Sequence, residues 1–234
     1  MARVSALIKR EVKETYWKRK TGLIIQLAVG AILVPTALFP MLGTTDMAKP
    51  AATTQSVLLG LFPVFVIVAV GVPFLIEHFF KDKMKRNIEV LLGLGFSPLE
   101  IWFAKIAAAG VFSLGSYVLG VILGVAWLKY DGAQMPSLPP WGILNLLMLS
   151  PLLGIAILGA KGLLHFLLSD IRLLNIAFVL PFVALFVFMR SILGFLGITS
   201  VDDRVISVML LAGSICLFSV SALLLKSLPK ERWL

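Results

Sequence analysis

Ionisable side chains gather in a short stretch between two long apolar runs, residues 81–105, and in the first twenty residues. Elsewhere, the groups suited to acid–base or metal chemistry are few: two histidines, His78 and His165, and scattered charges such as Lys161 and Asp170. This set makes neither a zinc site nor a pair of hydrolytic carboxylates. The sequence therefore predicts no catalytic residue and no metal ligand, and these groups are expected at helix ends, reaching toward a polar interface.

The composition indicates an all-α integral membrane protein. Of the 234 residues, 59% are hydrophobic and only 14% are charged, with a mean hydropathy of +1.01. A soluble domain typically has about 25% charged residues. The apolar residues also form runs of about twenty, which is the helix length needed to cross a hydrocarbon core about 30 Å thick.

Six membrane-spanning helices are predicted from these runs, separated by segments rich in Gly, Pro, Asp and Ser. Their expected ranges are 22–42, 56–77, 99–128, 141–160, 173–196 and 205–226. If the spans alternate in direction, seventeen of the 21 Lys and Arg residues fall on one side. The positive-inside rule makes that side cytoplasmic, so both termini are expected in the cytoplasm. The net charge of +9 is then a topology signal, and no nucleic-acid partner is expected.

The first 21 residues are predicted to form an amphipathic helix rather than a span. Apolar residues recur at helical spacing from Val4 to Tyr16, opposite Lys9, Arg10 and Lys13. Such a helix is expected in the cytoplasmic membrane interface, as a topology anchor or as a contact for a cytoplasmic partner. The predicted division is an interfacial helix (1–21), a six-span domain (22–226) and a short cytoplasmic tail (227–234).

A short amphipathic helix is predicted in the connection between the second and third spans, residues 78–98. Its apolar positions follow an i, i+4, i+7, i+8 pattern, and two pairs of opposite charge stand four residues apart on the other face. The apolar residues are Met84, Ile88, Leu91 and Leu92, and the pairs are Asp82 with Arg86 and Lys85 with Glu89. Gly93 and Gly95 are expected to end this helix.

The third span is predicted to begin at a capping box. Ser97, Pro98, Leu99 and Glu100 supply an N-cap serine, a proline at the first helical position and a glutamate at the third. Lys105 follows one to two turns later. On the residues alone, this connection is equally well explained as an interfacial connector.

The segment from Glu89 to Ile106, EVLLGLGFSPLEIWFAKI, resembles the cytoplasmic signature of ABC-2 type transporter permeases. The matching positions are Asp82, Glu89, Leu91, Leu92, Ser97, Glu100, Ile101 and Lys105. Two departures stand out. Arg86-Asn87 replaces the usual Gly-Thr, and Gly95 takes the place of a frequent proline, so that Pro98 is slightly displaced. The N-terminal helix, the six spans and the inserted segment extend the resemblance over essentially the whole chain.

The resemblance implies that the short helix is a coupling helix, which docks on a separate cytoplasmic ATPase. Its contact residues would be Asp82, Lys83, Lys85, Arg86 and Glu89. Its seating against the spans would use Met84, Ile88, Leu91 and Leu92, and its link to the third span would use Ser97, Glu100 and Lys105. Small or polar residues of that span, namely Ser113, Ser116, Tyr117, Gly120 and Gly124, are expected to serve helix packing or a substrate path.

The predicted function is the membrane subunit of an ATP-binding cassette exporter in a cell membrane. A permease chain of this half size is typical of prokaryotes. The sequence has no phosphate-binding loop, so the chain is not expected to be an enzyme, and ATP and Mg²⁺ would bind the partner. Two such chains, identical or different, would work with two ATPases. The substrate would be lipophilic or amphipathic: a drug, peptide, lipid or lipid-linked glycan. The alternatives are an autonomous secondary transporter or channel, or a non-transporting scaffold.

Overall fold

The computed structural model describes residues 2–18, 52–130, 139–167 and 202–227, together with residues 24, 28 and 32. All regular structure in these ranges is helical. The elements are α1 (Ala2–Lys18), α3 (Ala52–Met84), α4 (Asn87–Gly93), α5 (Pro98–Tyr130), α6 (Pro140–Leu144), the π-helical turn η1 (Asn145–Leu149), α7 (Ser150–Leu167) and α9 (Asp203–Ser227).

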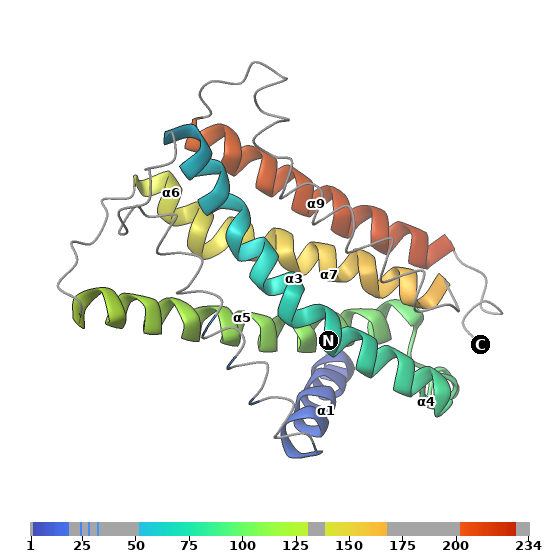
Figure 1. Cartoon of the computed structure of the whole chain (residues 1–234). Coiled ribbons are helices and arrows are strands. Elements are labelled where there is room, and N and C mark those ends of the chain that lie inside the picture. The colour runs from blue at the N-terminus through green and yellow to red at the C-terminus, as the bar shows by residue number, and fades with distance from the viewer. Residues whose placement is uncertain are drawn as a thin grey trace.

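Four long helices form the bundle. Helix α7 packs against α3, α5 and α9, and α5 also contacts α3. The short helix α4 lies at one end of the bundle and α6 at the other, while α1 contacts α5 and runs across the bundle axis (Figure 1). The core consists mainly of aliphatic and aromatic side chains of α3, including Phe62, Ile67 and Leu75, against Ala108 of α5 and Leu158 of α7.

Three described helical segments are long and apolar enough to cross a membrane, which indicates a membrane protein. They are Pro98–Trp127, Pro140–His165 and Asp203–Ser227, and they confirm the helices predicted for the third, fourth and sixth spans. Helix α3 covers the second predicted span but is longer at both ends, and its apolar portion is Leu61–Ile76. The spans predicted at 22–42 and 173–196, and the tail after Ser227, lie essentially outside the described residues.

The fourth span contains a π-helical turn that the sequence pattern did not predict. The N–H of Ser150 donates to the carbonyl of Asn145, five residues earlier. Pro151 has no N–H with which to continue this register, so the carbonyl of Leu146 needs another donor. The hydroxyl of Tyr117, on α5, supplies it at 3.0 Å. A buried tyrosine thereby satisfies the carbonyl that the proline leaves open.

The amphipathic helix predicted within residues 78–98 is instead split between two elements. Helix α3 continues to Met84, and a turn at Lys85 and Arg86 precedes α4. Both predicted charge pairs, Asp82 with Arg86 and Lys85 with Glu89, span this break, so their members do not share one helix. The turn redirects the chain so that Ile88 and Leu91 reach the core, with exposed fractions of 3% and 2%.

Both predicted signals after α4 are confirmed. Gly95 has a φ of +83°, which glycine adopts without strain, and the N–H groups of Gly95 and Phe96 donate to the carbonyls of Leu92 and Leu91. This is a Schellman motif, which ends α4 just after Gly93. The capping box then starts α5, because the N–H and Oγ of Ser97 donate to Glu100 at 2.8 and 2.9 Å. The N–H of Glu100 donates back to Ser97 Oγ at 3.3 Å.

A buried ionic cluster beside the short helix

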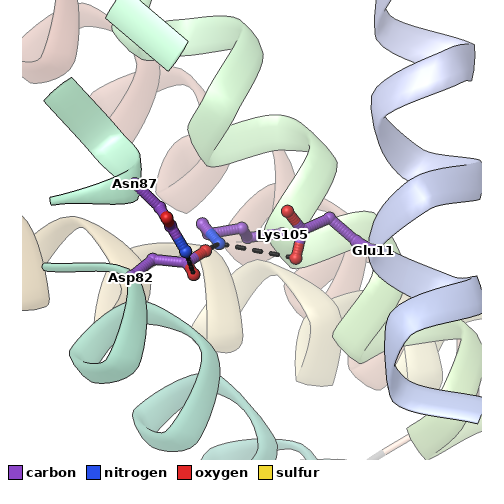
Figure 2. Close-up of polar contacts among 4 residues, drawn as sticks. All are labelled: Glu11, Asp82, Asn87 and Lys105. Atoms are coloured by element: carbon purple, nitrogen blue, oxygen red, sulfur yellow. Dashed lines mark hydrogen bonds and ion pairs between the residues drawn. The ribbon is translucent and has the colours of Figure 1, made fainter. Parts of the chain in front are cut away.

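Lys105 stands at the centre of a buried ionic cluster that joins four helices (Figure 2). Its Nζ forms an ion pair with Asp82 of α3 and another, at 3.4 Å, with Glu11 of α1. Asn87, the first residue of α4, donates from Nδ2 to the other oxygen of Asp82 at 2.9 Å. We call Glu11, Asp82, Asn87 and Lys105 the ionic cluster.

The ionic cluster is shielded from solvent. The side chains of Lys105 and Glu11 are 1% and 2% exposed, and that of Asp82 is 15% exposed. The ring of Phe79 covers the ammonium, with its centroid 5.5 Å from Nζ. Charges taken out of water are costly unless they are paired, so the three ionised groups hold one another in place. The cluster therefore fixes α1 and the start of α4 to α5.

Glu11 and Asn87 were not among the residues predicted for this site. Glu11 lies in the middle of the apolar face of α1, four residues after the buried Leu7 and beside Ile8 and Val12. Lys105 likewise interrupts the buried face of α5. When two helices each carry one charge in the middle of an apolar face, and the two charges are opposite, a buried ion pair is indicated. This pattern can be found in the sequence.

The residues predicted for partner contact divide between two environments. Lys85 and Arg86 are exposed, and Glu89 is half-buried on α4. Asp82 instead forms an ion pair with Lys105 and accepts a hydrogen bond from Asn87. Of the residues predicted to seat the helix, Ile88 and Leu91 are buried, and Leu92 packs partly against the core. The side chains of Lys83 and Met84 lie outside the described part of the structure.

Among the small and polar residues of α5, the buried ones serve contacts between and along helices. Ser113 and Ser116 are essentially unexposed and donate to the carbonyls of Ala109 and Phe112, one turn earlier, at 2.7 and 3.0 Å. Tyr117 bonds to the π-turn, and Gly120 and Gly124 are buried. These positions favour helix packing over a substrate path.

Lys161 and His165 differ from expectation. Both were expected to reach the interface from a helix end, but Lys161 is unexposed and His165 is 6% exposed. The imidazole stacks on Phe79 of α3, with ring centroids 6.1 Å apart. Both side chains are buried because α7 packs between α3 and α9, which cover more than one of its faces.

In the described ranges, no three His, Cys, Asp or Glu side chains gather where they would hold a metal ion. No family model matches the chain, and neither a curated protein nor a solved structure matches it significantly. The function is therefore inferred from the geometry of the ionic cluster and of α4, together with the motif resemblance.

The departure at Arg86 has a measurable consequence. Arg86 has a φ of +55°, a left-handed conformation that costs a non-glycine residue roughly 1–2 kcal/mol. Its side chain is exposed. We expect Arg86→Gly to raise the free energy of unfolding by up to about 1 kcal/mol, because relief of strain outweighs the greater freedom of glycine in the unfolded chain.

Thermal unfolding in nanodiscs would measure this effect, with Arg86→Ala as the control. Alanine removes the same side chain but keeps the strain, so it should leave stability close to that of the wild type. Equal effects of glycine and alanine would contradict a strained backbone at this position.

Proposed function

We propose that the chain is the membrane subunit of an ATP-binding cassette exporter of the ABC-2 type, with α4 as its coupling helix. The observation that carries the proposal is a short helix with a defined stop, a buried seat and an ionic cluster that anchors its first residue. A flexible interfacial connector needs none of these. A helix that transmits force from a partner needs all of them.

The position of Arg86 also supports the resemblance. Permeases of this family usually have glycine where Arg86 stands, and this residue has the left-handed backbone that glycine favours. At Arg86 the sequence thus differs from the family motif, but the backbone keeps the left-handed conformation that glycine would adopt.

A partner that moved α4 would act on several spans at once. Helix α4 is joined to α3 by a two-residue turn and to α5 by the capping box. Through Asn87 and Asp82 it is also joined to Lys105, and from there to Glu11 of α1. Because separating the buried charges is costly, these helix ends would move together rather than independently.

The docking face that we propose on α4 combines charged and apolar side chains. Val90 and Leu94 are 60% and 66% exposed, next to Lys85, Arg86 and the half-buried Glu89. An apolar centre with a charged rim is the usual composition of a protein interface. Val90 and Leu94 therefore join Glu89 as the residues on which docking would depend.

The full assembly follows from the same proposal. The chain would have six spans and both termini in the cytoplasm of the cell membrane, and two chains would bind two ATPases that hold ATP and Mg²⁺. The substrate would be lipophilic or amphipathic. Substrate would leave through a cavity between the two chains, driven by movement of both α4 helices.

The test is association with candidate ABC-type ATPase subunits from the same organism, measured in lipid nanodiscs by co-purification and by stimulated ATP hydrolysis. We expect Glu89→Lys and Val90→Asp each to weaken association at least about tenfold, as for central interface residues. Lys129→Glu, an exposed charge near the far end of α5, is the control and should bind as the wild type does.

Each outcome discriminates between hypotheses. Wild-type chain that is folded but binds no such ATPase would remove the exporter function and favour a scaffold or secondary transporter. Normal binding by both α4 variants would leave an ABC complex but exclude α4 as its docking helix. Binding without stimulated hydrolysis would favour the scaffold.

A further inference from the structure

A groove with a volume of about 860 Å³ lies between α1, α5 and α9, and none of its lining residues belongs to α4. Ile8 of α1, Trp102 and Phe103 of α5, and Phe218 and Ala222 of α9 supply apolar walls. Its volume is in the range of roughly 300–1,000 Å³ that is typical of ligand pockets.

One wall of the groove is fixed in place. Trp102 is 2% exposed, and its indole N–H donates to the carbonyl of Gly159 at 3.0 Å. Its ring meets Phe218 edge-on, with centroids 6.5 Å apart. Phe103 beside it is 49% exposed, so apolar surface faces the groove without a partner among the described residues.

The groove lies at the ends of two helices that are long and apolar enough to span a membrane. Leu99 and Phe103 belong to the first turns of the span Pro98–Trp127, and Phe218 and Ala222 belong to the later turns of the span Asp203–Ser227. An apolar molecule in the groove would therefore lie alongside the ends of two spans, with its polar end toward α1.

The mouth of the groove has an excess of positive charge. Lys9 lines it and is exposed. The exposed Arg3 lies six residues earlier on α1, outside the groove lining, and interacts electrostatically with Glu100. Glu100 is the one anion in the lining, and its Oε2 already accepts two hydrogen bonds from Ser97. Lys9 in the lining and Arg3 near Glu100 thus outnumber the one carboxylate.

We propose that this groove binds one anionic phospholipid. An acyl chain lies against Trp102, Phe103 and Phe218, and the phosphate lies between Lys9 and Arg3. A phospholipid is the molecule of the bilayer that combines hydrocarbon chains with an anionic group. The site is independent of the proposed ATPase, and it would anchor α1 through lipid on one side as the ionic cluster anchors it through Lys105 on the other.

The test uses fluorescence of Trp102 in a chain that lacks the other tryptophans through Trp17→Phe, Trp127→Phe, Trp141→Phe and Trp233→Phe. Nanodiscs of phosphatidylcholine receive increasing fractions of brominated phosphatidylglycerol or brominated phosphatidylcholine, whose bromines quench a nearby indole. We expect half-maximal quenching at an at least about fivefold lower fraction of phosphatidylglycerol, since cations near an anionic headgroup favour it.

The charge variants identify the headgroup contact. The double variant Arg3→Gln with Lys9→Gln should remove the preference for phosphatidylglycerol, whereas Lys13→Gln, an exposed cation of α1 that is absent from the groove lining, should preserve it. Because all three residues are exposed, these variants should fold as the wild type does.

Three results would overturn the proposal. Equal quenching by the two lipids would indicate ordinary boundary lipid. Quenching by neither would indicate that protein, from this chain or a second copy, fills the groove. An effect of Lys13→Gln as large as that of the double variant would indicate general surface charge rather than a site.

Discussion

Lys105→Met should destabilise the protein more than any other single charge removal in the described structure. It would leave Glu11 and Asp82 buried without their shared cation, and breaking a buried ion pair costs about 3–5 kcal/mol. For a chain of this length, that loss would lower the midpoint of thermal unfolding by on the order of 10 °C. Hydrogen exchange should also become faster in α1 and α4, because both are tied to α5 through Lys105.

The matched control is Lys129→Met, which removes an exposed cation from the other end of the same helix. Its effect on stability should be within about 0.5 kcal/mol, as for most surface substitutions. If the two variants unfold at the same temperature, the ionic cluster contributes nothing to stability.

A triple variant with a neutral cluster distinguishes the effect of charge on stability from the effect of packing. In Glu11→Gln with Asp82→Asn and Lys105→Met, the cluster holds no buried ion, so most of the lost stability should return. The three substitutions should therefore be strongly non-additive, since neighbours in one network couple. If exchange in α4 stays fast although stability is restored, the ionic pairs themselves orient the helix.

Local signals in the sequence predicted most of what surrounds α4. The capping box at Ser97, the stop at Gly95 and the buried face at Ile88 and Leu91 depend on neighbours within one or two turns, and each is confirmed. The long apolar helices followed from composition and run length, which requires no knowledge of their neighbours.

What the sequence did not predict depends on contacts between distant segments. The break at Arg86 is favoured because it lets α4 fold back onto the core, a gain that a helical periodicity cannot reveal. The partners of Lys105 come from positions 23 and 94 residues away. The π-turn likewise requires Tyr117, on another helix, to satisfy Leu146. Each feature exists because tertiary contacts outweigh a local preference.

These distant contacts also divide the molecule by chemistry. Ionic and polar links join the helices at the α4 end, whereas the middle of the bundle is held by close apolar packing of α3 against α7. An ionic end can be broken by removing one charge. The apolar middle can be tested only by changing volume.

Gly154→Ala should loosen this middle region, although alanine is the better helix former. A methyl group at Gly154 of α7 would lie 2.9 Å from both Cβ and Cγ2 of Ile67, and 3.5 Å from Cα of Val64. The Cβ of Ile67 cannot move without the α3 backbone, so the two helices must separate. We expect overpacking to cost about 1–3 kcal/mol, against a propensity gain of up to about 1 kcal/mol.

Gly115→Ala, on α5, is the matched control, because a methyl group at Gly115 meets no atom within 4 Å. It should leave the protein as stable as the wild type or slightly more stable, as measured by thermal unfolding in nanodiscs. Ile67→Ala should then be less harmful in the Gly154→Ala background than in the wild type, because the smaller side chain makes room for the new methyl group. Equal effects of Ile67→Ala in both backgrounds would show that Gly154 and Ile67 are not in close contact, and that α3 and α7 pack less tightly than their side-chain distances indicate.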